Sequence, residues 1–574
     1  MLPMLLAGIL TAPPLETVAE RTRYVQSGRY DEVIGFCKTL AELYPAKARC
    51  DVFGTTPEGR PMHVLTLAED GGLTPDDARA KGRHVVLAQG AIHAGELDGK
   101  DAGLALARDL LEGKTAPGLL GRVTLVFVPV YNVDGHENVA PANRPNQLGP
   151  ETPGFRVTAQ RLNLNRDYAK ADTPETRAML ALLRKWDPLV YVDLHTTNGM
   201  DFQPDVAIMV EPRFGWAAAM REAGDKVSSA LMTKLRTAGH LPLDFYPSAE
   251  DETRPLSGWA NGVASPRFSQ AYWPQWHRFG VLVESHALKS NARRVRASRD
   301  ALLGVLEVVR DDGAALTAAS NAAQVAMANI GGTEVALAFA PTGTPKVIEF
   351  RGVAYKELPS VITGKRWVQF DPSRPKLWKT PMLRDVAPSL TVKAPRGGYI
   401  VPPPWVAVVS PVLAAHGITT KLVVNGGSVG REVFQASTVK VAPRTTEGRT
   451  RVEIAGSWRA EKGDILPGSL YVPIAQRGGV MAMHLLEPQA PDSLVTWGFM
   501  NAVFEAREYV ELMVLEPFAQ KLLAADAQVK KEFDALVKSG ASEAERIDFF
   551  YRRHPAHDRL RDAYPVVRVD AAVE

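Results

Sequence analysis

Cysteine is scarce in this chain, and long apolar runs are missing from it. Cys37 and Cys50 are the only cysteines among 574 residues, and because they form no CxxC pair, a cysteine-based metal site is not expected. No stretch reaches the roughly eighteen uninterrupted apolar residues that a spanning helix needs, so we expect no membrane span. The net charge is only +3, without a long basic run, which leaves nucleic-acid binding without support.

The first twelve residues, MLPMLLAGILTA, are apolar and stop at Pro13 and Pro14. They resemble the hydrophobic part of a secretory signal, although the usual basic n-region is missing. We therefore interpret residues 1–19 as a signal, which predicts a periplasmic or extracellular protein, or as an apolar tail on a cytoplasmic one. In an exported protein Cys37 and Cys50 would form one disulfide, and two buried thiols are the alternative.

The length and composition are those of a folded protein with roughly two to four domains. Apolar residues make up 45% and charged residues 23% of the chain, which is typical of globular proteins. Within residues 20–325, buried strands are predicted to alternate with amphipathic helices. The strand segments are HVVLAQG, RVTLVFVPVYN, LVYVDLH and GVLVESH. This alternation predicts an α/β fold with a mixed, mostly parallel sheet flanked by helices.

Beyond residue 325 the pattern changes. Short β-like segments such as KVIEFRGVAY and KLVVNGG are separated by Pro and Gly clusters, which predicts a smaller β-rich accessory module over residues 326–495. Helical patterning resumes near Trp497, so residues 496–574 are predicted to form a helical C-terminal segment. Packing against the first domain is the simplest role for both.

Polar side chains follow three of the predicted strands, at the edge where ligands gather in an open α/β sheet. HVVLAQG leads to His93 and Glu96, LVYVDLH stops at His195, and GVLVES reaches Glu284. Two imidazoles and one carboxylate, with a fourth position left for water, form one of the standard open catalytic zinc sites. We therefore expect one Zn2+ per chain on the first three residues, with Glu284 as the general base.

The order of these residues resembles a known family. HAGE, the Asn-Arg pair in RLNLNRDY, DLHTT and LVES are similar to the pattern of the zinc carboxypeptidases of the M14 class, in particular bacterial exported members with a C-terminal extension. GTTPEGR and VPVYNVDG, with Asn132, Asp134 and Gly135, also resemble segments that flank the site in that family. The resemblance spans roughly residues 20–300 and implies a zinc peptidase fold.

The resemblance further implies that Asn165 and Arg166 grip the terminal carboxylate of the substrate, a task that suits a planar guanidinium. Asn163 stands where members of this class often have an Asp that supports a zinc-bound histidine. Asn can accept the same hydrogen bond but brings no charge. Asp193, two residues before His195 and therefore on the same sheet face, is an alternative source of that carboxylate.

Two further roles follow from the resemblance. Arg144 is our choice for the arginine that stabilises the oxyanion, with Arg156 and Arg161 as rivals. Tyr272 is the expected substrate-contacting tyrosine. Its rivals are Tyr246 and Trp259.

The predicted reaction is zinc-dependent hydrolysis of amide bonds that removes C-terminal amino acids from peptides. A zinc amidase or deacylase that acts on N-acyl amino acids or cell-wall peptides is the nearest alternative, because the same catalytic centre would serve it. The second alternative is a binding module that retains the fold but does not catalyse a reaction. In the catalytic cases the partner is a peptide or acyl-amino-acid substrate with a free carboxylate. No pattern in the chain indicates an oligomeric state.

Overall fold

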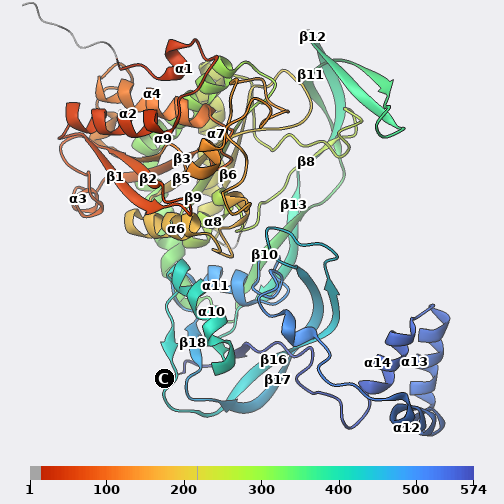
Figure 1. Ribbon diagram of the computed structural model, residues 1–574. Coiled ribbons are helices and arrows are strands. Elements are labelled where there is room, and N and C mark those ends of the chain that lie inside the picture. The colour runs from red at the N-terminus through yellow and green to blue at the C-terminus, as the bar shows by residue number, and fades with distance from the viewer. Residues whose placement is uncertain (1–14, 216, 574) are drawn as a thin grey trace, which may run out of the picture.

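The structure, a computed structural model, describes residues 15–215 and 217–573. The signal-like residues 1–12 lie outside the described residues. The chain forms an N-terminal region, residues 15–329, and a C-terminal region, residues 330–573 (Figure 1). In the described ranges no helix is both long and apolar enough to cross a membrane.

A mixed sheet forms the centre of the N-terminal region (Figure 1). Its strands are β1 (Ala48–Thr55), β2 (Pro61–Leu67), β3 (His84–Gly90), β4 (Val123–Val128), β5 (Val190–Thr196), β6 (Val206–Glu211), β7 (Pro242–Leu243) and β9 (Phe279–Ser285). Among the described residues the strand order is β1-β2-β4-β3-β5-β9-β6-β7. The four central strands β4, β3, β5 and β9 are parallel, whereas β2 and β6 pair with them in the antiparallel sense.

Helices cover both faces of this sheet, which confirms the predicted fold class (Figure 1). Three helices pack together on one face, α4 (Asp98–Leu111), α7 (Ala218–Thr237) and α9 (Asn291–Ala326). On the other face lie α6 (Pro174–Trp186) and α8 (Ser269–Tyr272). The remaining helical segments are α1 (Val18–Arg21), α2 (Tyr30–Leu43), α3 (Pro75–Ala80), α5 (Val133–Glu137) and the 3-10 turns η1 (Leu119–Gly121), η2 (Leu164–Arg166), η3 (Trp273–Trp276) and η4 (Met327–Asn329).

The central strands are apolar along their length because neither face of the sheet meets water there. β4, β5 and β9 are buried at every residue, and β3 at all but its first. A parallel sheet that is covered on both sides produces such continuous runs instead of alternation. Polar side chains therefore stand out where the strands end.

The two cysteines are joined by a disulfide. Cys37 lies in α2 and Cys50 in the edge strand β1, and their sulfur atoms are bonded. Of the two alternatives, the disulfide is thus confirmed. It fastens α2 to the outer edge of the sheet, where β1 has a neighbour on one side only.

The C-terminal region is rich in β-structure. One pair of strands is β10 (Glu334–Pro341) with β13 (Val386–Lys393), and a long hairpin is formed by β11 (Lys346–Pro359) and β12 (Arg366–Leu383). A further sheet of described strands has the order β15-β18-β14-β19-β16-β17. These strands are β14 (Gly398–Val401), β15 (Lys421–Leu422), β16 (Gly427–Val441), β17 (Val452–Ile465), β18 (Leu470–Pro473) and β19 (Val567–Val569).

Helices of this region occur on both sides of residue 495. Two of them, α10 (Pro403–His416) and α11 (Gly479–Leu486), lie inside the span predicted as β-rich. The helical segment itself contains η5 (Asn501–Phe504), α12 (Leu512–Ala525), α13 (Ala527–Lys538) and α14 (Glu543–Tyr551). After α14 the chain returns as β19 between β14 and β16. β19 therefore joins β14 and β16 within one sheet, although it follows them by more than a hundred residues in the chain.

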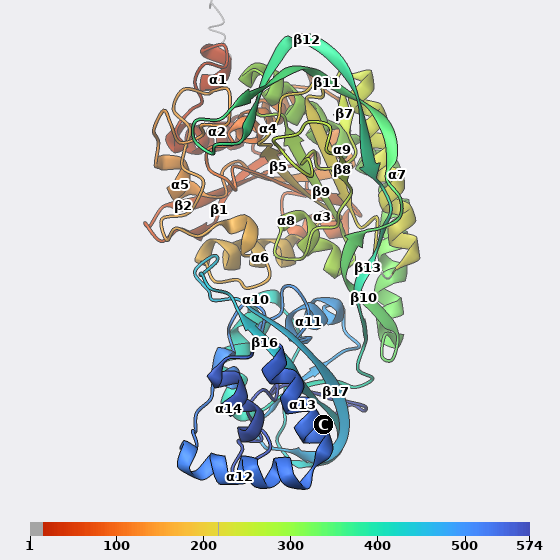
Figure 2. The same ribbon diagram turned by 90° about the vertical axis from the view of Figure 1, so that its right-hand side faces the viewer.

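The two regions share packing. The largest hydrophobic cluster draws buried residues from both regions; the first of them in the chain is Tyr30 and the last is Val566. A second cluster joins the base of the β11–β12 hairpin to the N-terminal region and includes Phe202, Trp259, Phe350 and Trp378. The short strand β8 (Trp259–Ala260) also pairs with β12. As a result the hairpin curves over the N-terminal region (Figure 2).

Candidate active site

The three residues predicted as metal ligands converge at the carboxyl ends of β3 and β5. His93 and Glu96 lie in the turn between β3 and α4, and His195 lies on β5. One carboxylate oxygen of Glu96 is 2.9 Å from His93 Nδ1, and the other is 2.9 Å from His195 Nδ1. All three residues are buried, and their ligand atoms lie within 4.8 Å of one another. This donor set and spacing fit a single cation.

Asp193 orients one of the imidazoles. Its Oδ2 is 2.7 Å from His195 Nε2, so the opposite ring nitrogen, Nδ1, faces Glu96. The hydroxyl of Ser269 also donates to Asp193, which is fully buried. Burial disfavours the charged form of His195, but Asp193 and Glu96 together raise its pKa well above the usual range. The carboxylate that was an alternative in the sequence thus contacts the histidine.

Glu284 lies beside the three ligands without joining them. It is on β9, directly opposite His195 in the parallel pairing of β5 with β9. Its side chain is buried, and its Oε2 has no hydrogen-bond partner among the described residues. Burial raises the pKa of Glu284 to about 8, although nearby His195 acts in the opposite direction. The position and the free oxygen are those of a group that can accept and release a proton.

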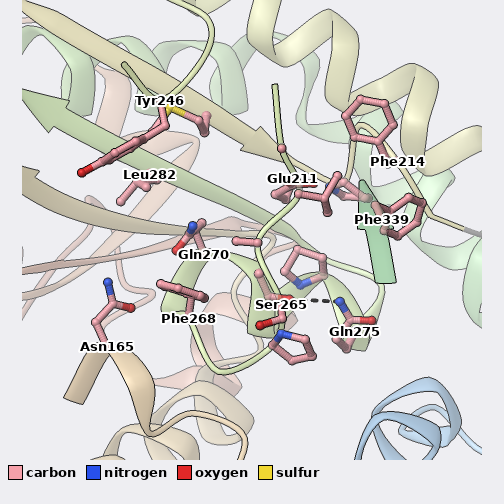
Figure 3. A pocket seen from close by; sticks show the side chains of 18 of the residues that line it. Asn165, Glu211, Phe214, Tyr246, Ser265, Phe268, Gln270, Gln275, Leu282 and Phe339 are labelled. Carbon is pink, nitrogen blue, oxygen red and sulfur yellow. Dashed lines mark hydrogen bonds between the residues drawn. The ribbon is translucent and has the colours of Figure 1, made fainter. Parts of the chain in front are cut away.

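A cavity of about 660 Å³ extends from these four residues. This volume is within the usual range for sites that bind small molecules. Figure 3 shows Asn165 and the hydroxyl of Tyr246 at one end and Phe214 and Phe339 at the other. Phe339 belongs to β10, so the C-terminal region supplies part of the wall.

Residues 33–204 match the family model described as zinc carboxypeptidase. This part of the chain is thus similar to the zinc carboxypeptidases. Over 228 residues the chain is 26% identical to "Probable carboxypeptidase 2" of Arthroderma benhamiae, which covers 38% of this chain and 40% of that protein. It is likewise 26% identical over 228 residues to "Carboxypeptidase 2" of Trichophyton rubrum, covering 38% and 39%. The chain therefore spans about two fifths of the length of these curated relatives.

Solved carboxypeptidase structures also match part of the chain. A metallo-carboxypeptidase from Burkholderia cenocepacia aligns over 50% of this chain and 70% of its own, with 18% identity and a TM-score of 0.36. Carboxypeptidase A from Helicoverpa armigera aligns over 52% and 75%, with 14% identity and a TM-score of 0.35.

The Asn-Arg pair expected of a zinc carboxypeptidase lies in the cavity wall. The side-chain oxygen of Asn165 accepts from the backbone N–H of Ser269, and its amide nitrogen is 3.3 Å from His195 Nε2. The Arg166 guanidinium lies 4.2 Å above the ring of Phe268 and donates to a backbone carbonyl. Within the described residues no carboxylate forms an ion pair with Arg166, so its charge is available to a ligand. Asn163 accepts a hydrogen bond from the N–H of Asn165 and shapes this turn.

The three candidate arginines occupy different places. Arg144 is buried, and its guanidinium is 2.9 Å from Glu96 Oε1. Arg156 lines the cavity and is 3.6 Å from the same oxygen, with a third of its side chain exposed. Arg161 is exposed and stacks on Phe155. Of the three arginines, Arg156 alone is among the residues that line the cavity.

The expectation that Tyr272 contacts substrate needs correction. Tyr272 is fully buried on α8, and its hydroxyl bonds to His416 of α10, so it packs between the two regions. Trp259 lies in the cluster at the base of the β11–β12 hairpin. The rival Tyr246 lines the cavity, and the charge of Glu284 together with burial raises the pKa of its phenol. Of these residues, Tyr246 is therefore the tyrosine that lines the same cavity as Glu284.

Sequence reasoning missed the contribution of the C-terminal region. Leu337 and Phe339 of β10 and His484 of α11 all line the cavity. Glu447, at the turn between β16 and β17, accepts a hydrogen bond of 2.9 Å from the N–H of Asn163. No local pattern could have shown these contacts, because each joins residues that are far apart in the chain.

Proposed function

We propose that this protein is a zinc-dependent carboxypeptidase that hydrolyses the last peptide bond of a peptide and releases its C-terminal amino acid. The observation that carries the proposal is the convergence of His93, Glu96 and His195 beside Glu284, in a cavity whose wall also holds Arg166. The family of residues 33–204 and the names of the curated relatives support it.

The donor set suits one zinc ion per chain. Two imidazole nitrogens and one carboxylate are three of the four ligands of an open catalytic zinc site. Asp193 holds the ring of His195 in the way that outer partners hold zinc-bound histidines. When bound, zinc would lower the pKa of a water molecule and polarise the carbonyl group of the substrate.

Glu284 carries the proton in this proposal. Its carboxylate takes a proton from the attacking water and delivers it to the nitrogen of the leaving amine. Burial raises its pKa, and a divalent cation on the neighbouring ligands would lower it again. The carboxylate form needed to accept a proton would then be present at neutral pH.

Cavity residues bind and orient the substrate. Arg166, with the amide of Asn165, receives the terminal carboxylate through charge-assisted hydrogen bonds. We assign the stabilisation of the developing oxyanion to Arg156 because it lines the cavity, whereas the guanidinium of Arg144 is turned toward Glu96. The hydroxyl of Tyr246 lies at the same end of the cavity as Asn165 (Figure 3).

The first experiment measures zinc content and the chelator-sensitive release of C-terminal amino acids from a mixed peptide library. Wild type is compared with Glu284→Gln and with Glu222→Gln, a control that changes an exposed glutamate on α7. All three proteins should carry zinc, and only Glu284→Gln should lose about 10²–10⁴ in kcat/KM, the usual contribution of a general base. Zinc binding with hydrolysis of N-acyl amino acids alone would identify a deacylase, and zinc binding without any hydrolysis a binding module.

We also propose that the protein is exported. The disulfide between Cys37 and Cys50 supports this, because such bonds persist in oxidising compartments. Cell fractionation, with N-terminal sequencing of the mature protein, tests the idea. A protein that stays in the cytoplasm with residues 1–19 attached would contradict it.

A further inference from the structure

A carboxylate lies in the cavity wall at a distance from the reacting centre. Glu211 is the last residue of β6, and it shares a sheet face with Ala207 and Met209. In the antiparallel pairing with β9, Ala207 lies opposite Glu284 and Glu211 opposite Gly280. Four residues of strand therefore separate Glu211 from the level of the general base, a distance of about 14 Å.

No cation neutralises this carboxylate within the described residues. Glu211 is 8% exposed and lines the cavity. Its carboxylate accepts a long hydrogen bond, 3.4 Å, from the backbone N–H of Arg213. The guanidinium of Arg213 pairs with Asp225 instead. Burial consequently raises the pKa of Glu211 to about 7.

Apolar side chains lie beside Glu211. Figure 3 shows Glu211 next to Phe214 and Phe339, and Met209 and Met220 are also among the residues that line the cavity. A ligand group that fits must therefore have an aliphatic stem to pack on these side chains and a charged end to meet the carboxylate. Lysine and arginine side chains have that construction.

We propose that this part of the cavity receives the side chain of a C-terminal lysine or arginine, whose cationic end pairs with Glu211. The proposal rests on the carboxypeptidase function given above and names its substrate class. Phe339 and Leu337 cover the stem, so the C-terminal region takes part in selecting the substrate. Glu211 itself contacts neither the water nor the carbonyl group that react.

The test compares kcat/KM for benzoylglycyl dipeptides that end in Lys, Arg, Phe or Glu. Wild type should prefer Lys and Arg. Glu211→Gln should lower kcat/KM for these two by about 30-fold or more, the usual loss when a buried charge pair is broken, and leave Phe within about threefold. Glu222→Gln, the exposed control, should change nothing. Zinc content and thermal melting show that each variant is folded.

The outcomes separate this proposal from the one on which it rests. If wild type cleaves the Phe peptide as well as the Lys peptide, or if Glu211→Gln slows all peptides equally, Glu211 does not select a cation. If wild type releases no terminal residue from any peptide, the carboxypeptidase function fails and the substrate class falls with it.

A second, independent observation concerns the β11–β12 hairpin, residues 346–383, which we call the basic arm. Its base is held by the cluster of Phe350 and Trp378 and by two hydrogen bonds from Gln203 to the backbone of β11. Its tip is free of such packing, with Val361 at 101% and Ile362 at 91% exposure. Figures 1 and 2 show the arm extending along the outside of the N-terminal region.

Positive charge is concentrated in the basic arm. Its residues include eight Lys or Arg and three Asp or Glu, and all eight basic residues are exposed. The arm therefore has a net charge of +5, whereas the whole chain has +3, so the rest of the protein is negative by two charges. Trp367, 45% exposed, stands next to the tip.

We infer that the basic arm docks on an anionic lipid surface. The side chains of Val361 and Ile362 enter the interface, Trp367 lies at the level of the headgroups, and Lys356 and Lys365 meet their phosphates. Fully exposed aliphatic side chains at the end of a cationic hairpin are costly in water and favourable at such a surface.

Co-sedimentation of the full chain with vesicles tests this inference. The protein should pellet with vesicles that contain phosphatidylglycerol and stay in solution with pure phosphatidylcholine. Val361→Asp with Ile362→Asp should reduce the bound fraction by about tenfold or more, and so should Lys356→Glu with Lys365→Glu. Val424→Asp changes an equally isolated side chain, 72% exposed, outside the arm and should have no effect.

Three results would overturn the inference. Binding to neutral vesicles as strong as to anionic ones removes the role of charge. Binding that survives the tip variant places the contact elsewhere. Arm-dependent binding to an anionic polysaccharide, without binding to vesicles, assigns the arm to a polymer instead of a lipid surface.

Discussion

Replacement of Asp193 by asparagine tests how the N-terminal region would hold the proposed zinc ion. Asp193 is fully buried, 2.7 Å from His195 Nε2, and also accepts from the hydroxyl of Ser269. Asparagine has nearly the same shape, and its oxygen can keep the hydrogen bond to the ring. The substitution therefore removes a negative charge while the geometry is preserved.

The magnitude follows from the position of this carboxylate. Loss of the outer partner of a metal-bound histidine costs about 10- to 100-fold in metal affinity, which corresponds to about 1.4–2.7 kcal/mol. Bulk solvent does not reach Asp193, so little screening weakens its interaction with the ring. We expect the upper part of this range, about 30- to 100-fold.

The assay is competition for zinc with a chromophoric chelator. Asp205→Asn is the matched control, because Asp205 forms a buried contact of 2.7 Å with another histidine, His240, which is not a predicted ligand. Asp193→Asn should weaken zinc binding, and Asp205→Asn should leave it unchanged. Equal zinc affinity in wild type and Asp193→Asn would refute the orienting role of this carboxylate.

Three further predictions concern stability. Trp378→Ala should cost about 3–5 kcal/mol, because Trp378 is buried in the cluster that holds the basic arm; hydrogen exchange should show the loss first in β11 and β12. Cys37→Ser should lower the free energy of unfolding by about 3 kcal/mol in urea, and reduction of wild type should reproduce this. Burial raises the pKa of Glu175 from 4.5 to about 7. The free energy of unfolding is therefore highest below pH 4.5, where the carboxyl is neutral in both states, and it falls as the pH rises through 7. Glu175→Gln should therefore gain up to about 3 kcal/mol in urea unfolding at pH 8 and nothing at pH 4; an equal gain at both pH values would contradict it.

Local patterns made the central sheet and the cluster of His93, Glu96 and His195 predictable. β3, β5 and β9 are short apolar runs with polar residues at their ends, a signal that survives in one sequence because it depends on neighbours in the chain. His93 and Glu96 are three residues apart, and Asp193 and His195 are two apart, so each pair is oriented by its own backbone. The structure brings these local pairs to one point because the strands that carry them are adjacent.

The positions of the remaining site residues depend on loop conformations, which the periodic patterns of helices and strands do not predict. Tyr246 lies in a long irregular stretch and Tyr272 at the end of the four-residue helix α8. Packing alone turns the first toward the cavity and the second toward His416. The difference between Arg144 and Arg156 is also a matter of loop path. The β-rich pattern after residue 325 was readable, whereas the return of β19 to the sheet depends on pairing across more than a hundred residues.

A cavity shared by both regions has a consequence for the nascent chain. The four residues proposed as metal ligands and base have all been made once synthesis reaches Glu284, but the cavity wall also needs Phe339 and His484. At about 5–20 residues per second of synthesis, the 200 residues from 284 to 484 take about 10–40 s. During that interval a ribosome-bound chain would expose the proposed catalytic residues without the side chains that complete the cavity wall. Folding after export would delay both halves until the whole chain is present and would spare cytosolic peptides.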